Sequence, residues 1–171
     1  MKITIITPTY NEAENLPKLV SAILALPLHL HILVVDDNSP DVTGRIADEL
    51  AAQDKRVQVL HRPGKLGLRS AYLNAFQHVL QGDTDVIVQM DADFSHDPTV
   101  LMDMTECMAC PAVSHPVFMG HSHRRARDTN GGWARESCDV VIGSRYVEGG
   151  SVDERWPLWR KQQISPFCWK R

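Results

Sequence analysis

Asp91-Ala92-Asp93 is the stretch of this sequence whose residue types and spacing point most directly to chemistry. Its two carboxylates are two residues apart, so on extended backbone they would project in the same direction. The apolar run 86–90 comes just before them, and its length favours a strand covered on both faces. Pro98 suits the first turn of a helix. The sequence therefore predicts that Asp91 and Asp93 lie in a loop between a strand and a helix.

Carboxylates at the end of a strand indicate a particular ligand chemistry. Open α/β sheets bind their ligands at the carboxyl ends of the strands. Hard oxygen ligands in such a loop suit Mg²⁺ or Mn²⁺ that holds a diphosphate. The alternative for an isolated pair of aspartates is a solvated acidic turn, and the pair by itself leaves both interpretations open.

Two further polar clusters follow apolar runs in the same manner. One cluster, 10–12, follows the run 3–7, and the other, 36–37, follows the run 32–35. If these runs are parallel strands, all three polar clusters lie on one edge of the sheet, where a nucleotide would bind. Any one cluster has the composition of an ordinary turn. Three of them on one edge favour a ligand site.

The elements that must position these residues alternate between strand and helix. Strands are predicted over 3–7, 32–35, 57–60 and 86–90, and the loop 61–67 follows the third of them. The helices between them are predicted from apolar residues at helical spacing: Leu16, Leu19, Val20, Ile23 and Leu24; Ile46, Ala47, Leu50 and Ala51; and Leu68, Tyr72, Ala75, Phe76 and Val79. Such alternation predicts an α/β fold, with a parallel sheet, right-handed crossovers and helices on both faces.

The polar residues between strands and helices also divide into caps and ligand candidates. Asn15 is expected to cap the first helix. Asp41 and Thr43 are better placed than Asp37 to cap the second helix. We therefore expect Asp37 to lie at the nucleotide edge of the sheet, beside the end of the first strand.

Missing motifs and charge exclude several classes of protein. Neither G-x-G-x-x-G nor G-x-x-x-x-G-K-[ST] occurs, which argues against a dinucleotide oxidoreductase and a P-loop NTPase. A nucleotide site without such a loop needs a metal to neutralise the diphosphate, and Asp91 and Asp93 can supply its ligands. The net charge of −3 argues against a general nucleic-acid binder.

Length and composition indicate one globular domain. The chain has 171 residues and 43% hydrophobic residues, enough for one domain with a real core. No stretch approaches the roughly 18 continuous apolar residues of a membrane span. The N-terminus runs directly into a strand pattern, so no signal peptide is expected. Four cysteines without a secretory signal suggest a reducing, cytosol-facing compartment.

Five motifs, in order along the chain, resemble those of family-2 glycosyltransferases. They are TPTYNEAENLP, VVDDNSPDVTG, HRPGKLGLRSAY, VQMDADFSHDP and VVIGSRYVEGG. The similarity covers residues 1 to about 104 and 138 to about 165, and it is greatest to the polyprenyl (dolichyl)-phosphate mannose synthases. It implies a Rossmann-like nucleotide-sugar glycosyltransferase fold of GT-A type with a mainly parallel central sheet.

The resemblance also implies a reaction and a location. Mannose would pass from GDP-mannose to polyprenyl (dolichyl) phosphate with inversion, in the presence of Mg²⁺ or Mn²⁺. The product, dolichyl-phosphate mannose, would serve glycosylation and lipid-anchor synthesis. The protein would act peripherally at the cytoplasmic face of a membrane, the endoplasmic reticulum in a eukaryote, with or without separate membrane subunits. An acceptor phosphate is ionised at neutral pH, so it needs no general base.

Site residues follow from the resemblance by motif position. The residues implied to hold the guanosine are Pro8, Tyr10, Glu12, Val35 and Asp37. Those implied to flank the diphosphate and the metal are Asp91, Ala92, Asp93 and Ser95, of which Asp91, Asp93 and Ser95 are the implied metal ligands. Arg145 is implied to contact a phosphate of the donor or of the lipid, and it forms the catalytic set with Asp91 and Asp93. Arginine suits this role because its planar fork donates two hydrogen bonds at once.

Two regions depart from the family pattern. Residues 105–137 are expected to form an irregular insertion within a single domain, 1–165. A zinc site is the alternative there, but its candidate ligands match no standard spacing: Cys107, Cys110, His115, His121, His123 and Cys138. The segment 166–171 is expected to be a divergent end of a C-terminally shortened domain.

Three functions therefore compete. The first is the lipid-phosphate mannosyltransferase. The second is a related enzyme that uses another sugar, such as glucose from UDP-glucose. The third is a truncated, inactive form that binds a nucleotide or has a regulatory role, because the family's acceptor-site residues have no counterpart after the end of the similarity.

Overall fold

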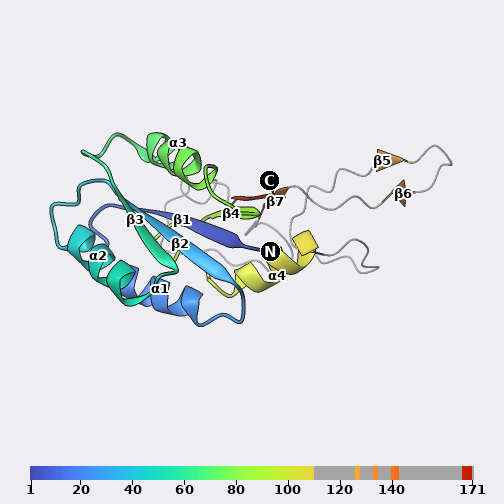
Figure 1. Ribbon diagram of the computed structural model, residues 1–171, viewed down its shortest axis with the longest axis horizontal. Coiled ribbons are helices and arrows are strands. Elements are labelled where there is room, and N and C mark those ends of the chain that lie inside the picture. Colours follow the sequence, from blue (N-terminus) through green and yellow to red (C-terminus); the bar gives the residue numbers. More distant parts are fainter. Residues whose placement is uncertain (110–125, 128–132, 135–139, 143–166, 171) are drawn as a thin grey trace, which may run out of the picture.

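Strands and helices alternate along the first 109 residues of the chain. The structure, a computed structural model, describes residues 1–109, 126–127, 133–134, 140–142 and 167–170. The alternating elements are β1 Ile3–Thr9, α1 Leu16–Leu24, β2 Leu30–Asp36, α2 Thr43–Gln53, β3 Val57–His61, α3 Leu68–Val79, β4 Val86–Gln89 and α4 Val100–Ala109 (Figure 1). The predicted order is confirmed. Pro98, however, lies two residues before α4 rather than in its first turn.

The central sheet has the strand order β3-β2-β1-β4-β8-β7. β1 to β4 are parallel, whereas β8 (Phe167–Lys170) runs antiparallel to both β4 and β7 (Val140–Ile142). The segment expected to be a divergent end thus contributes a strand to the sheet, between β4 and β7. Inside the expected irregular insertion, β5 (Ala126–Arg127) pairs with β6 (Trp133–Ala134) as a separate two-stranded sheet.

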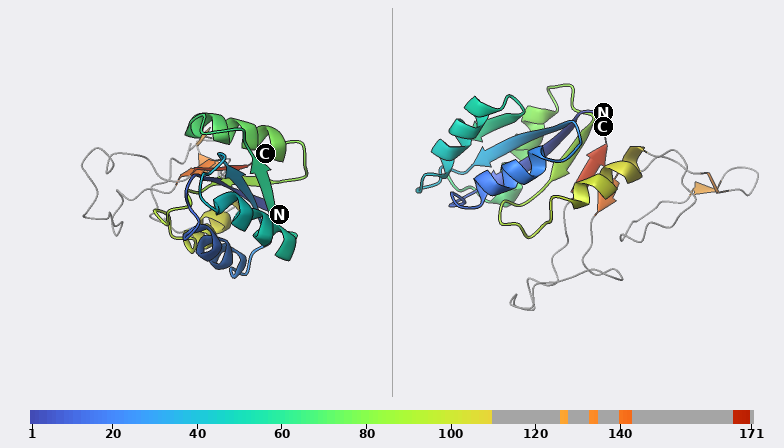
Figure 2. Two further views of the ribbon diagram at one scale, coloured as in Figure 1. Left: turned by 90° about the vertical axis from the view of Figure 1, so that its left-hand side faces the viewer. Right: turned by 90° about the horizontal axis from the view of Figure 1, so that it is seen from below.

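Helices cover both faces of the sheet, as predicted. α1, α2 and α4 lie on one face and α3 lies on the other (Figures 1 and 2). Successive residues of β1 supply the two faces, since Ile5 is buried beneath α1 and α4 whereas Ile6 is buried beneath α3. Strands covered in this way have near-continuous apolar sequences, which is why the runs in β1, β2 and β4 predicted them correctly.

The helical stripes are largely those expected. Leu16, Leu19, Val20 and Ile23 of α1 are all buried. In α3 the buried residues are Ala71, Ala75 and Val79, whereas Leu68 is 56% exposed. Leu68 was expected on the buried stripe, but it is the first residue of α3 and lies one turn before the part that packs on the sheet. Within the part of the chain that the structure describes, no helix has the length and apolarity of a membrane span.

The starts of α1 and α2 are stabilised differently. Asn15 occupies the N-cap position of α1, but its side chain makes no capping bond and its amide donates to Glu12 Oε2 at 2.8 Å. At α2, Asp41 Oδ1 accepts the main-chain N–H of Thr43 at 2.9 Å. The expected side-chain cap of α1 is therefore wrong. At α2 the N-cap position is Val42, and Asp41, one residue before it, accepts the N–H of the first helical residue instead.

Asp41→Ala is expected to lower the free energy of unfolding by about 0.5–1 kcal/mol at neutral pH, because the carboxylate satisfies an N–H at the start of α2. Hydrogen bonding from Thr43 holds the pKa of Asp41 below its ordinary value. The stabilisation is thus complete above the ordinary pKa of aspartate and is lost as the pH falls through the lowered pKa of the folded state. Urea unfolding at neutral and acid pH measures this. An equal loss at both pH values would contradict the assignment.

The strand order also identifies where a ligand would bind. β1 lies between β2 and β4 in the sheet. The chain leaves β1 toward β2 on one side, whereas it returns from β3 to β4 on the other side, so the two connections run in opposite directions. Open α/β sheets bind ligands at the carboxyl ends of strands where the strand order reverses. The loops after β1 and β4 meet at that point.

Candidate functional site

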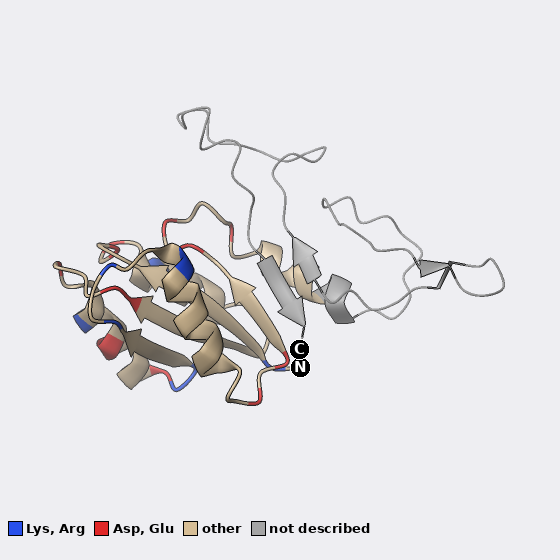
Figure 3. Cartoon of the chain, turned by 90° about the horizontal axis from the view of Figure 1, so that it is seen from above, with Lys and Arg blue, Asp and Glu red and all other residues tan. Residues whose placement is uncertain are grey.

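The strand register aligns the polar clusters along one edge of the sheet. Thr9 at the end of β1 lies opposite Asp36 at the end of β2, and Asp36 lies opposite His61 at the end of β3. The main-chain N–H of Met90 donates to Ile6 O at 3.1 Å, which places the end of β4 beside β1. Acidic positions lie on the loops at this end of the sheet, opposite the N-terminus (Figure 3). We call this set of loops the carboxyl edge.

Asp37 forms a buried ion pair at the carboxyl edge. Its Oδ1 lies 2.5 Å from Nη1 of Arg62, and the two side chains are 9% and 4% exposed. Nη2 of Arg62 donates to Ser70 Oγ at 2.6 Å, which ties the pair to the first turn of α3. The main-chain N–H of Asp37 donates to Thr9 O at 3.1 Å. Asp37 therefore lies beside the end of β1, at the edge where the sequence predicted it.

Asp36, the neighbouring carboxylate, holds the loop after β2. Its Oδ1 accepts the hydroxyl of Ser39 at 2.6 Å, and its Oδ2 accepts the Ser39 N–H at 3.3 Å. A Cβ on Gly44 would come within 3.0 Å of Asp36 Oδ2, so the start of α2 approaches the carboxylate closely. Ser39 Oγ also accepts the N–H of Asn11 at 3.2 Å. Asp36 thus fixes the loops after β1 and β2, which leaves Asp37 as the ligand candidate of the two.

Tyr10 and Glu12 lie in the loop after β1. Lys65 Nζ is 3.9 Å from the ring centroid of Tyr10, so the loop after β3 reaches across to the loop after β1 by a cation–π contact. The N–H of Glu12 donates to Thr43 Oγ1 at 2.9 Å, which holds this loop against the start of α2.

Pro8 and Val35 are paired in the β1–β2 register. Val35 is fully buried beneath α3, so its side chain lies in the core.

Asp91 and Asp93 lie in the loop between β4 and α4, as predicted. Asp91 is half-buried and Asp93 is exposed, whereas Ala92 between them is buried in the core. Residues 92 and 93 form a turn rather than extended backbone. The N–H of Ser95 donates to Asp93 Oδ1 at 2.9 Å, a local bond that favours the turn.

Asp91 is held by two neighbours. The hydroxyl of Tyr72 donates to Asp91 Oδ1 at 3.3 Å, and the main-chain N–H of Asp91 donates to His96 Nδ1 at 3.4 Å. Burial first, and then the charge of Asp91, raises the pKa of Tyr72. Tyr72 therefore stays protonated and remains a hydrogen-bond donor at physiological pH.

Left-handed backbone recurs at the carboxyl edge. Among the described residues other than glycine, positive φ occurs at Asn11 (61°), Asn38 (54°) and Phe94 (57°), which follow β1, β2 and β4. Asparagine tolerates this conformation, but a bulky residue such as Phe94 does not adopt it readily. Phe94 is 40% exposed, so the strain is not a requirement of core packing. Strained backbone of this kind is typical of ligand-binding loops.

The donor set at Asp91 and Asp93 fits a cation that is shared with a ligand. No group of three or more His, Cys, Asp or Glu in the described residues could enclose a metal. Mg²⁺ commonly binds one or two carboxylates and completes its shell with phosphate oxygens and water. Two carboxylates in an open loop match that requirement.

Several predicted residues fall outside the described part of the chain. Arg145 does so, and so do most of the candidate zinc ligands: Cys110, His115, His121, His123 and Cys138. Cys107 lies in α4. The roles of these residues stay predictions.

Arg62, Ser70 and Tyr72 are the residues of the candidate site that sequence reasoning missed. Arg62 follows the end of β3, so the strand-end rule that selected the other three clusters would have selected it too. Ser70 and Tyr72 are on α3, and Tyr72 was interpreted only as part of an apolar stripe. Its hydroxyl is the feature that the stripe does not explain.

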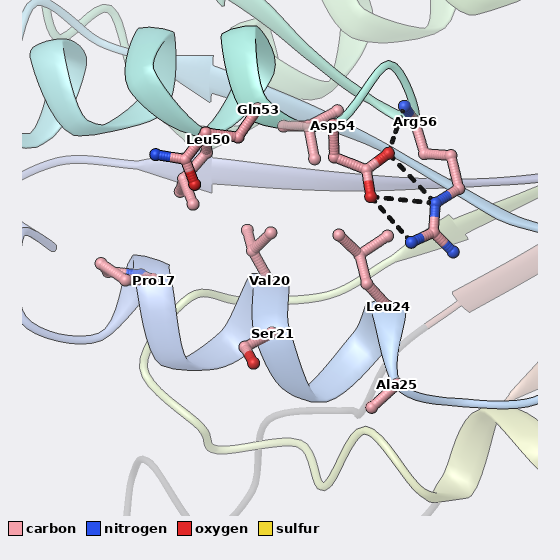
Figure 4. Close-up of a pocket in the computed structure, with 10 residues that line it drawn as sticks. Pro17, Val20, Ser21, Leu24, Ala25, Leu50, Gln53, Asp54 and Arg56 are labelled. Carbon is pink, nitrogen blue, oxygen red and sulfur yellow. Dashed lines mark hydrogen bonds and ion pairs between the residues drawn. The ribbon is translucent and has the colours of Figure 1, made fainter.

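A hollow between α1 and α2 lies apart from the carboxyl edge (Figure 4). Its lining includes Val20, Leu24 and Leu50, and the ion pair of Asp54 with Arg56 closes one end. No residue of the predicted site lines it.

Comparison with known proteins gives consistent similarities. A profile described as "Glycosyl transferase family 2" matches residues 4–130. The polyprenol monophosphomannose synthase of Mycolicibacterium smegmatis is 42% identical over 162 residues, which are 94% of this chain and 51% of that protein. The dolichol-phosphate mannosyltransferase of Pyrococcus furiosus is 37% identical over 163 residues, which are 94% of this chain and 38% of that protein. The chain thus spans about half, or less, of these relatives.

A solved structure is also similar. It is the mannosyltransferase PcManGT from Pyrobaculum calidifontis in complex with GDP-Man and Mn²⁺. The TM-score is 0.54 and the identity 25%, over 65% of this chain and 33% of that chain.

Proposed function

Because the chain belongs to glycosyl transferase family 2, we propose that it carries the donor site of an enzyme that transfers mannose from GDP-mannose to a polyprenyl phosphate. Its fold is of the GT-A type, with a mainly parallel central sheet. The observation that carries the proposal is the position of Asp91 and Asp93 at the end of β4, beside the end of β1 and on the same edge as Asp37. The names of two relatives, a polyprenol monophosphomannose synthase and a dolichol-phosphate mannosyltransferase, support a polyprenyl-phosphate acceptor and mannose as the sugar.

The loops after β1 and β2 would hold the guanosine. The ring of Tyr10, which Lys65 contacts on one side, would contact the nucleoside. Asp37 lies at the same edge with Oδ1 bonded to Arg62, which fixes the orientation in which its carboxylate would accept N–H groups of guanine. Glu12 is held beside them by Thr43. Pro8 lies next to them in β1, and Val35 would contribute through its main chain.

The loop after β4 would hold the diphosphate and a divalent cation. Asp91, Asp93 and Ser95 are the proposed ligands, with Ala92 at the buried centre of the loop. The cation, Mg²⁺ or Mn²⁺, would offset the negative charge that develops on the departing nucleoside diphosphate. The complex of PcManGT with GDP-Man and Mn²⁺ supports a metal of this kind. Arg145 would contact a phosphate of the donor or of the lipid.

The proposed reaction needs alignment more than proton transfer. A phosphate monoester is ionised at neutral pH, so the acceptor can attack the anomeric carbon without a general base. The protein contributes by holding the donor in line with that attack and by stabilising the leaving group. One displacement inverts the anomeric centre. The polyprenyl acceptor would bring the protein to a membrane surface peripherally, at the cytoplasmic face.

A transfer assay tests this function. The purified chain is incubated with labelled GDP-mannose, Mn²⁺ and a polyprenyl phosphate, and label is counted in the lipid phase. Label that depends on the chain and disappears with a chelator is the expected result. Label that persists with the chelator would contradict the metal's role.

A second candidate function is a nucleotide-binding form without transfer. Binding of GDP-mannose with no label in the lipid phase would support it. A donor competition with UDP-glucose separates the mannosyltransferase from an enzyme that uses glucose, since GDP-mannose alone is expected to raise the melting temperature.

A further inference from the structure

We propose that Tyr72 is a positioning residue for the metal site, because its hydroxyl fixes one oxygen of Asp91 and leaves the other for the cation. The inference rests on the proposed function, which assigns Asp91 to the metal. Tyr72 closes the motif HRPGKLGLRSAY, but the sequence pattern assigned it no role beyond the apolar stripe of α3.

The contact joins two elements that are far apart in the chain. Tyr72 is on α3, and Asp91 follows β4. The hydroxyl lies 3.3 Å from Asp91 Oδ1, while the ring packs against the core beneath α3 and lies 6.5 Å from the ring of Phe76. A ring fixed by packing holds its hydroxyl in one place, so the bond restrains the carboxylate rather than following it.

The geometry of Asp91 makes this restraint relevant to a ligand. A carboxylate has two oxygens, and Tyr72 engages Oδ1. The main chain of the same residue is held by His96 Nδ1 at 3.4 Å. With main chain and Oδ1 both held, Oδ2 is the oxygen with which Asp91 would meet a cation. Partners that orient metal ligands in this way contribute to metal affinity although they never touch the metal.

The same helix also restrains Asp37, the carboxylate proposed to bind the nucleoside. Ser70, two residues before Tyr72, accepts a hydrogen bond from Arg62, which in turn holds Asp37. The start of α3 therefore contacts both the nucleoside side and the metal side of the candidate site. This separation supplies a comparison, because loss of the Ser70 hydroxyl would affect the nucleoside side and loss of the Tyr72 hydroxyl would affect the metal.

The test is Tyr72→Phe, which removes the hydroxyl and keeps the ring. The full 171-residue chain is titrated with Mn²⁺ in the presence of GDP, and free Mn²⁺ is followed by electron paramagnetic resonance. The apparent affinity for Mn²⁺ is expected to fall about tenfold. Thr84→Val is the matched control, since it removes one hydroxyl of the buried Thr4–Thr84 pair (2.8 Å) at the opposite end of the sheet. The Thr84→Val variant is expected to bind Mn²⁺ with the affinity of the wild type.

Thermal unfolding without metal completes the experiment. If Tyr72→Phe lowers the melting temperature but binds Mn²⁺ with wild-type affinity, the hydroxyl has only a structural role and the inference is overturned. If the wild type itself binds no Mn²⁺ with GDP, the proposed function fails, and the inference fails with it. A tenfold loss in Tyr72→Phe, with wild-type affinity in Thr84→Val, supports both.

Discussion

Asp93→Ala is expected to lower the affinity for GDP-mannose in the presence of Mn²⁺ by about 100-fold or more, with the fold intact. Loss of a partner that only orients a metal ligand costs about 10–100-fold in metal affinity, so loss of a ligand should cost at least as much. Asp93 is exposed in a loop, and its Oδ1 accepts the N–H of Ser95 from the same turn. Its removal therefore leaves no cavity in the core. Isothermal titration with and without Mn²⁺ measures the effect.

Asp97→Ala is the matched control for this change. Asp97 is an exposed aspartate of the same loop, and it accepts the N–H and the hydroxyl of Thr99 just before α4. The control removes one negative charge close to the site without removing a proposed ligand. If Asp97→Ala weakened binding as much as Asp93→Ala, the effect would reflect the charge of the loop and the assignment of Asp93 would be wrong.

Arg62→Ala is expected to lower the free energy of unfolding by about 3–5 kcal/mol, because it leaves the carboxylate of Asp37 buried without its cation. The ion pair is almost fully shielded from water, and Arg62 also bonds Ser70. Urea unfolding followed by circular dichroism gives the change in free energy. Donor binding should weaken as well, since Asp37 and the start of α3 lose their common partner.

Two further variants make the stability prediction specific. Arg45→Ala breaks an exposed ion pair with Glu49 on α2, at 3.6 Å, and should cost less than about 0.5 kcal/mol. The double variant Asp37→Asn with Arg62→Ala removes both buried charges at the same loss of packing, and it should be more stable than Arg62→Ala alone. A double variant that is less stable than the single one would show that loss of packing, and not an unpaired charge, causes the destabilisation.

Local periodicity was sufficient to predict most of the fold. Buried parallel strands such as β1 and β2 are continuous apolar runs, and α1 has one apolar stripe. A few neighbouring residues are therefore enough to predict each of these elements. β8 is different. It is four residues long and pairs with β4 and β7, which precede it by at least 25 residues in the chain. A short antiparallel strand has no local pattern that separates it from a loop, so its place in the sheet depends on contacts that the sequence does not display.

The residues of the candidate site that directly follow a strand could be predicted from their position in the sequence. Asp37, Asp91 and Asp93 follow strands, and parallel strands bring their carboxyl ends to one edge. The residues that orient them were not predictable in this way. Tyr72 fits an apolar stripe equally well with or without its hydroxyl. Arginine is usually found at the protein surface, but Arg62 lies buried beside Asp37. Their roles depend on distances between elements, such as the 3.3 Å from Tyr72 to Asp91.

The carboxyl edge is expected to bind the sugar nucleotide together with a divalent cation. Amide hydrogen exchange of the wild-type chain, with and without GDP-mannose and Mn²⁺, tests it most directly. Slower exchange is expected in segments 9–12, 36–39, 62–70 and 91–95, and no change is expected along the hollow between α1 and α2 (Figure 4). Protection confined to that hollow, or protection of the carboxyl edge that is the same with a chelator in place of Mn²⁺, would contradict it.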